Sequence, residues 1–292
     1  MARTALQIVK DLEREHTEAG QLPLKLTPGW SPDKRGMSKS LARSALFAVR
    51  DKRLPRERYD NAVMASLDGI EIRYSGEELR QDDHDVFMQL CHLARDEHIG
   101  EEVHITGAQA LDGLKWGRSD EDYTRLRSCY KRMLEGTVYV TLTSGKSNTR
   151  LFGSHLFQYV TADVDNSANI DSTAARWTIK LNAELANIIN GNQMTLIKWA
   201  ADKKMTPLAK WLHRFYATHD RDKTFDYKAE TLHRLCGSKM SNMATWRQNL
   251  KRALEELVSA GFIKSYTIGP KPSYMVHVVA RTLAEIDAAE SN

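Results

Sequence analysis

Apolar residues in the C-terminal part of the chain recur at the spacing of a helix with one buried side. Between Leu208 and Tyr216 the large apolar side chains fall at positions i, i+3, i+4, i+7 and i+8. The stretch 241–260 places Trp246 and Leu257 on one side of a helical wheel and polar residues on the other. This pattern predicts two amphipathic helices that pack against a common core.

The same order of elements occurs twice along the chain. Residues 87–140 and residues 208–279 each have the pattern of a helix, a short strand, a short helix, a long amphipathic helix and a pair of strands. Three helices followed by a β-hairpin make a winged helix-turn-helix, whose third helix lies in the major groove of DNA. The sequence therefore predicts an α+β fold with two tandem winged-helix domains related by internal duplication.

Prolines and polar stretches set the predicted domain boundaries. Residues 1–40 carry three of the seven prolines and no core pattern, so we expect a flexible N-terminal segment, with Trp30 outside the core. The first winged-helix domain is expected over residues 41–165 and the second over residues 176–285, with a polar connection between them.

Composition and motifs exclude several classes of protein. The chain has no apolar run long enough to span a bilayer, and its N-terminus is too charged for a secretory signal. The cysteines, Cys91, Cys129 and Cys236, are expected in the core, and their small odd number indicates a reducing compartment. Walker-type phosphate-binding loops, HExxH motifs and paired CxxC sites are absent. We therefore expect no catalytic activity, no cofactor, no metal and no membrane partner.

Positive charge concentrates in the C-terminal part. Residues 176–292 carry 18 lysines and arginines against 11 carboxylates, whereas residues 1–175 carry 24 against 27. The outward side of the helix 241–260 presents hydroxyl, amide and guanidinium groups, of which an amide suits adenine and a guanidinium suits guanine. With neighbouring lysines, the predicted DNA contacts are Ser241, Thr245, Gln248, Lys251, Arg252, Lys239 and Lys271. The alternative is an ordinary solvated helix face.

The corresponding helix of the first domain begins with carboxylates. Asp120 and Glu121 occupy the turn that would approach DNA phosphates, where they would be repelled. We therefore expect the second domain to be the main sequence reader, and the first to contact mostly the DNA backbone. The contacts assigned to it are Arg127, Lys131, Lys146 and Arg150. Arg132 is expected on the same outward helix face as Arg127 and Lys131. Ordinary surface charge is the alternative.

Several segments resemble a known family of plasmid proteins. They are ARSALFAVRDKRLPRE (42–57), YSGEELRQDDHDVF (74–87), LKWGRS (114–119), KMTPLAKWLHRFYATH (204–219), LHRLCGS (232–238) and WRQNLKRALEEL (246–257). In this order they resemble TrfA, a family of replication initiators of broad-host-range IncP-type plasmids, over about residues 40–280. The resemblance implies binding to origin repeats (iterons), help in opening the origin, and recruitment of the host replicative helicase and initiator. It also implies a homodimer that binds iterons poorly.

The resemblance further implies a docking motif for the β sliding clamp in the N-terminal segment. Clamp-binding peptides use a glutamine and spaced apolar side chains, which here correspond to Gln21, Leu22, Leu24 and Leu26. Pro23 and Lys25 depart from the family pattern, which has a Leu-Phe pair where Leu24-Lys25 falls, so Leu26 would supply the final anchor. The alternative is an ordinary apolar patch in a linker.

The sequence leaves two other functions open. A transcriptional repressor or autoregulator with the same winged-helix fold would bind DNA equally well without initiator activity. A nickase would need catalytic groups, and the chain has no His-x-His cluster with a nearby tyrosine. The function that the sequence favours is that of a cytoplasmic, DNA-binding replication initiator.

Overall fold

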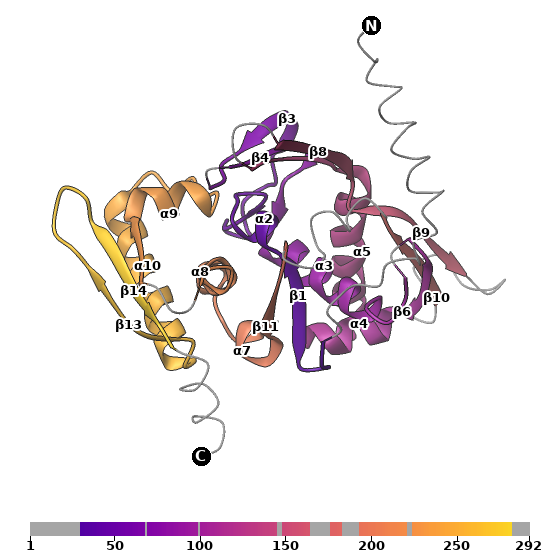
Figure 1. Cartoon of the computed structure of the whole chain (residues 1–292). Helices are drawn as coiled ribbons and strands as arrows, with labels where there is room; N and C mark the ends of the chain where they lie inside the picture. Colours follow the sequence, from indigo (N-terminus) through magenta and orange to yellow (C-terminus); the bar gives the residue numbers. More distant parts are fainter. Residues whose placement is uncertain are drawn as a thin grey trace, which may run out of the picture.

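Alternating strands and helices build the N-terminal part of the protein in a mixed α/β arrangement (Figure 1). The computed structural model describes residues 30–67, 69–98, 100–144, 148–163, 176–182, 193–220 and 224–281. The elements up to residue 181 are β1 (Lys34–Ser38), α2 (Lys39–Ala42), β2 (Phe47–Ala48), β3 (Arg58–Met64), β4 (Ile70–Glu77), β5 (Leu79–Arg80), α3 (Gln81–Leu93), β6 (Glu102–Thr106), α4 (Gly107–Leu114), α5 (Asp120–Glu135), β7 (Thr137–Ser144), β8 (Asn148–His155), β9 (Phe157–Asp163) and β10 (Arg176–Leu181).

Two antiparallel sheets accompany the helices of this part. β3, β4, β7 and β8 form one sheet in that order, and β6, β10 and β9 form the other. The helices α3, α4 and α5 contact one another and supply Phe87, Leu111 and Leu126 to a first hydrophobic core. The short strands β2 and β5 pair in parallel and contact α3. The helices are thus held between sheets by apolar side chains.

A group of helices and a small sheet build the C-terminal part (Figure 1). The elements are β11 (Met194–Lys198), α7 (Trp199–Lys203), α8 (Pro207–Ala217), β12 (Thr224–Lys228), α9 (Ala229–Leu235), α10 (Met243–Ser259), β13 (Ile263–Ile268) and β14 (Met275–Ala280). α10 packs on α8, and β12, β14 and β13 form an antiparallel sheet in that order. Trp211, Trp246 and Leu254 are buried in a second hydrophobic core that joins these elements.

Local sequence signals explain the two long helices of the second core. Pro207 stands at the first position of α8, where its fixed φ suits a helix and its missing N–H costs no hydrogen bond. The helices predicted over 208–216 and 241–260 are confirmed as α8 and α10. Over the residues that the structure describes, none of the helices is both long and apolar enough to cross a bilayer.

α8 departs from the expected one-sided pattern because it contacts elements of both cores. All its residues from Leu208 to Ala217 are buried, including Lys210, His213 and Arg214. α10 covers one side of this helix, and α2, α3 and β11 contact it from the N-terminal part and its neighbouring strand. The polar residues of α8 therefore need partners inside the protein.

Those partners form the α3–α8 ion network, which consists of Asp85, Asp202, Lys203, Lys210 and Arg214. Arg214 forms ion pairs with Asp85 and, at 2.5 Å, with Asp202, while Lys210 and Lys203 lie 2.5 and 3.1 Å from Asp85. Burial alone would raise the pKa of both carboxyl groups. Arg214, with Lys210 and Lys203, outweighs this effect at Asp85, and Arg214, with His213, outweighs it at Asp202, so both pKa values lie below the ordinary range. Both carboxyl groups therefore stay ionised inside the protein.

The flexible segment expected over residues 1–40 ends earlier than predicted. β1 pairs with β11 from Lys34 to Ser38, and Trp30 is only 7% exposed. The Trp30 indole N–H donates a 2.9 Å hydrogen bond to Nδ1 of His92 in α3. The expectation was wrong here because the strand partner lies far along the chain, where local composition gives no sign of it. Trp30 is thus a core residue.

Acidification below about pH 6.5 is expected to destabilise the fold through His92. Burial, with Arg35 and Arg95 close by, lowers the pKa of His92 from its ordinary 6.5 to about 3. Between these values the unfolded chain binds a proton that the folded protein does not. The free energy of unfolding should therefore fall as the pH falls from about 6.5 to about 3. Urea denaturation followed by circular dichroism at several pH values measures this slope.

The variant His92→Gln is the control. Its amide oxygen can still accept the hydrogen bond of the Trp30 indole, but nothing titrates, so part of the slope should disappear. His84 and His219, whose pKa values burial also lowers, keep contributing to the remaining slope. An identical slope in the variant would contradict the role of His92.

Candidate nucleic-acid interface

The start of α10 is a helix end that suits an anion. The Asn242 side-chain oxygen accepts hydrogen bonds from the backbone N–H groups of Ala244 and Thr245 at 3.0 and 3.1 Å. The first turn of α10 contains no acidic residue. The positive end of the helix dipole is therefore not offset by a carboxylate, and such an end favours a phosphate.

The residues predicted to read bases are exposed along α10 and just before it. Ser241, Thr245, Gln248 and Arg252 all lie at the surface, on the side opposite the buried Trp246. Within the described part of the chain, none of these four side chains makes a hydrogen bond or an ion pair. Their donors and acceptors are thus available to a partner in solvent.

The two lysines predicted beside them are engaged with carboxylates. Lys251 lies 4.0 Å from Glu255, one turn further along α10, in an exposed pair of small energetic weight. Lys239, in the turn between α9 and α10, forms an ion pair with Glu57 and lies 5.9 Å from the ring centre of Tyr59. Lys239 must therefore exchange Glu57 for a phosphate if it contacts DNA.

The turn between β13 and β14 contributes a further cation. Lys271 in this turn is exposed. Tyr274, at its end, lies against Arg247 of α10, with the guanidinium carbon 4.0 Å from the ring centre. The sequence did not single out Arg247 as a contact. Its position depends on the Tyr274 ring, which comes from a separate hairpin. The contact fixes the hairpin turn beside the helix, so that both can face one partner.

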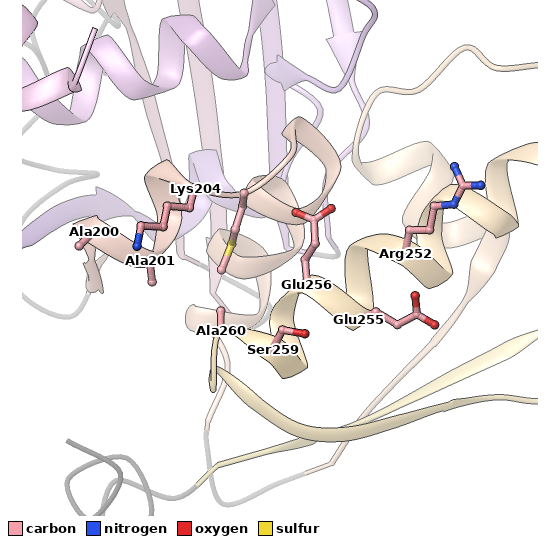
Figure 2. A pocket seen from close by; sticks show the side chains of 9 residues that line it. Ala200, Ala201, Lys204, Arg252, Glu255, Glu256, Ser259 and Ala260 are labelled. Carbon is pink, nitrogen blue, oxygen red and sulfur yellow. The ribbon is translucent and has the colours of Figure 1, made fainter. Parts of the chain in front are cut away.

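A groove separates the C-terminal half of α10 from α7 (Figure 2). It encloses about 700 Å³ and is lined by residues of both helices, among them Lys204, Arg252 and Glu255. The carboxylate of Glu256 in its wall accepts hydrogen bonds of 2.8 Å from the N–H and the hydroxyl of Thr206. The two glutamates would repel a phosphate backbone. On α10, the residues that precede Glu255 are therefore better suited to face DNA than those that follow it.

The corresponding helix α5 begins with carboxylates. Ser119 and Asp122 form a capping box, in which each side chain accepts a hydrogen bond from the other's backbone N–H. Asp120 and Glu121 lie exposed in the same turn. Their negative charge disfavours a phosphate at this end. The comparison favours α10 over α5 as the helix that grips DNA.

The predicted cations of α5 are differently placed. Arg127 donates a 3.0 Å hydrogen bond to Thr124, and Lys131 lies 3.8 Å from Glu135 in an exposed pair. Lys131 points to solvent, whereas Arg127 is half-buried. The exposed pair of Lys131 is weak enough that this lysine could exchange Glu135 for a DNA phosphate.

Arg132, expected on the outward face of α5, is in fact buried. It is 9% exposed and lies 2.8 Å from Asp83, a fully buried carboxylate of α3. Asp83 also accepts a 2.7 Å hydrogen bond from the Arg80 N–H at the start of α3 and an ion pair from Arg56. A carboxylate buried so deeply needs cationic partners, which turns Arg132 inward.

Several predicted contacts fall where the structure gives no side chain. Arg150 belongs to β8, but its side chain is not among those described. Lys146 and the clamp motif of Gln21, Leu22, Leu24 and Leu26 lie outside the described residues. These assignments stay predictions.

The cysteines are core residues, as predicted. Cys91, Cys129 and Cys236 are buried and unpaired, and burial raises the pKa of the Cys91 and Cys236 thiols to about 12. Such thiols are unreactive at neutral pH. Among the residues with described positions, histidine, cysteine and carboxylate side chains nowhere gather in a group that could hold a metal ion.

Most of the chain has relatives among known proteins. The family model described as TrfA protein matches residues 4–275. The plasmid replication initiator protein TrfA of Escherichia coli is 28% identical over 246 residues, which cover 84% of this chain and 62% of that protein. The chain therefore matches less than two thirds of this relative's length.

Two solved structures share the fold. The structure of a selenomethionine derivative of domains 2 and 3 of RctB has a TM-score of 0.56 at 12% identity, covering 80% of this chain and 95% of that one. A second structure of RctB domains 2–3 has a TM-score of 0.55 at 12% identity, covering 83% and 97%. At this identity the likeness concerns the mixed α/β fold alone.

Proposed function

Because the chain belongs to the TrfA family, we propose that it is a plasmid replication initiator that binds iterons at an origin. It would do so through two winged-helix domains related by duplication, of which the second, with α10 and the hairpin β13–β14, is the main reader. The first, with α5, would add weaker backbone contacts through Arg127, Lys131, Lys146 and Arg150.

The remaining steps follow from the same family membership. The bound protein would assist the opening of the origin and recruit the host replicative helicase and initiator in the cytoplasm. A homodimer would be its inactive form. The motif of Gln21, Leu22, Leu24 and Leu26 would dock on the β sliding clamp.

One observation supports DNA reading by α10 most directly. Its N-terminal half combines a positive helix end without a carboxylate with an outward side whose polar groups are not engaged within the described chain. The opposite side is anchored by Trp246, Leu250 and Leu254 in the second core. A rigid helix with free hydrogen-bonding groups on one side is the arrangement that base reading in a major groove requires.

Arg252→Ala is expected to weaken specific binding by about 1–3 kcal/mol, because a guanidinium that reads guanine contributes discrimination of that size. Lys251→Ala should weaken all duplexes alike and reduce the salt dependence by about one unit of slope. Fluorescence anisotropy measures both effects. The probes are a duplex enriched from a random-sequence pool by the full chain and a scrambled duplex of the same composition.

An equal loss on both duplexes for Arg252→Ala would refute its assignment as a base reader. Initiation itself needs a second test. The gene should sustain a plasmid that carries the enriched repeats and lacks any other origin. If the protein binds the repeats but the plasmid is lost, it is a DNA-binding repressor and the initiator assignment fails.

A further inference from the structure

The segment 49–57, which connects β2 to β3, lies against the turn that precedes α10 (Figure 1). The Val49 N–H donates a 2.8 Å hydrogen bond to the carbonyl of Cys236. The next residue, Gly237, has a φ of +68°, and a Cβ there would stand 2.9 Å from the Cβ of Ala48. The two backbones therefore touch with no room for a side chain. The start of the segment has a defined position beside the end of α9, where the turn that leads to α10 begins.

A chain of alternating charges anchors this segment. From the surface inward its members are Lys239, Glu57, Arg50, Glu78 and Arg80. Glu57 pairs with Lys239 and lies 2.8 Å from Arg50; Arg50 lies 3.2 Å from Glu78, which lies 2.6 Å from Arg80. Arg80 also donates hydrogen bonds of 2.9 to 3.0 Å to the backbone carbonyls of residues 51, 54 and 55. Because Glu78 and Arg80 are buried, the segment is held from beneath.

The anchored segment exposes two cations at its tip. Lys52 is exposed and makes no hydrogen bond or ion pair with any residue whose position is described. The Arg53 side chain is 83% exposed and lies 2.6 Å from its neighbour Asp51. Arg53 holds Asp51 through both Nε and Nη2, but the pair lies in solvent, where a phosphate can compete with the carboxylate. Arg56, in contrast, is turned inward to the carboxylates of α3.

We infer that Lys52 and Arg53 bind the phosphate backbone of duplex DNA beside the site that α10 reads, provided that the chain binds DNA as proposed above. Both ends of the segment contact the turn that leads to α10, so its basic tip can meet the same duplex, and each phosphate that it neutralises releases counterions. Lys239, which pairs with Glu57 at the end of the segment and precedes the helix in the chain, could contact the same backbone. One duplex would then touch both the N-terminal and the C-terminal part at a single place.

Lys52→Gln and Arg53→Gln in the full chain test this contact. Each is expected to weaken binding about fivefold at about 0.15 M salt, because the binding constant varies with salt to the power of about −0.9 for each phosphate. The loss should be the same on the enriched and the scrambled duplex. The slope of log K against log salt should fall by about 0.9 for each variant and by about twice that for the double variant.

Arg73→Gln is the matched control. Arg73 is a cation on β4 whose side chain is 41% exposed and pairs with Glu71, so its replacement removes the same charge at another surface and should leave binding unchanged. Circular dichroism and urea denaturation show whether each variant folds.

Each other outcome overturns the inference in a recognisable way. The tip does not contact DNA if the Lys52 and Arg53 variants keep the wild-type affinity and salt slope. The same conclusion holds if their loss of affinity is no larger than that of Arg73→Gln. In that case a selective loss in Arg252→Ala leaves the proposed function standing. A loss on the enriched duplex alone excludes a backbone contact. If the wild-type chain prefers no duplex over a scrambled one, the proposed function fails and the contact with it.

Discussion

Asp85→Ala is expected to lower the free energy of unfolding by about 3–5 kcal/mol. Asp85 is buried in the α3–α8 ion network and faces Arg214, Lys210 and Lys203. Without it, Arg214 and Lys210 stay buried with only Asp202 as counter-charge, and an uncompensated buried cation is costly. Urea denaturation followed by circular dichroism gives the difference, provided that the slope with denaturant stays the same.

Lys203→Met separates this effect from a general intolerance of the site. The methionine fills the space of the lysine stem, and Asp85 keeps Arg214 and Lys210 as partners. The loss of stability should therefore be clearly smaller than for Asp85→Ala. Equal losses in the two variants, or a loss below about 1 kcal/mol for Asp85→Ala, would show that the carboxylate does not hold the network together.

The elements that sequence patterns predicted well are those whose signals are local. α8 and α10 follow from apolar spacing, and the start of α8 follows from Pro207. The core positions of Trp246 and the cysteines follow from the same helical period. A helix carries its own hydrogen bonds, so a window of a few turns contains most of the information that places it.

The features that were missed depend on partners far along the chain. β1 forms because β11 completes it, and the intervening sequence gives no sign of that pairing. Arg132 turns inward because Asp83 of α3 needs a cation, although the helical wheel places Arg132 with exposed residues. α8 is buried on its polar side because the N-terminal part supplies Asp85.

The same distinction applies to the candidate interface. The exposure of Ser241, Thr245, Gln248 and Arg252 could be predicted, because it is complementary to the buried side of one helix. The pairing of Lys239 could not, since its partner Glu57 comes from a different part of the chain. The sequence singled out the segment 49–57 only for its resemblance to the family and gave no reason to assign DNA contacts to its charges. The structure suggests a role in DNA binding for these charges because it places the segment against the turn that precedes α10.

Trp246→Ala is expected to lower the free energy of unfolding by about 3–5 kcal/mol, the cost of removing a buried aromatic side chain. The Trp246 side chain is 2% exposed, and its ring meets that of His233 of α9 edge-on, with the centres 5.0 Å apart. It therefore anchors the N-terminal half of α10, the half proposed to read DNA, to the second core. Urea denaturation measures the loss, and Trp246→Phe should recover part of it because a ring still fills the site.

Gln248→Ala is the matched control for Trp246→Ala, because Gln248 lies on the same helix but on its opposite side. Gln248 is exposed and not engaged within the described chain, so its removal should change the free energy of unfolding by no more than about 0.5 kcal/mol. Its effect should appear in specific DNA binding instead, where an amide that reads adenine contributes about 1–3 kcal/mol. If Gln248→Ala destabilises the fold while Trp246→Ala does not, the buried and the reading sides of α10 are the reverse of those described. If neither Gln248→Ala nor Arg252→Ala weakens specific binding in a stable protein, α10 is not the reading helix.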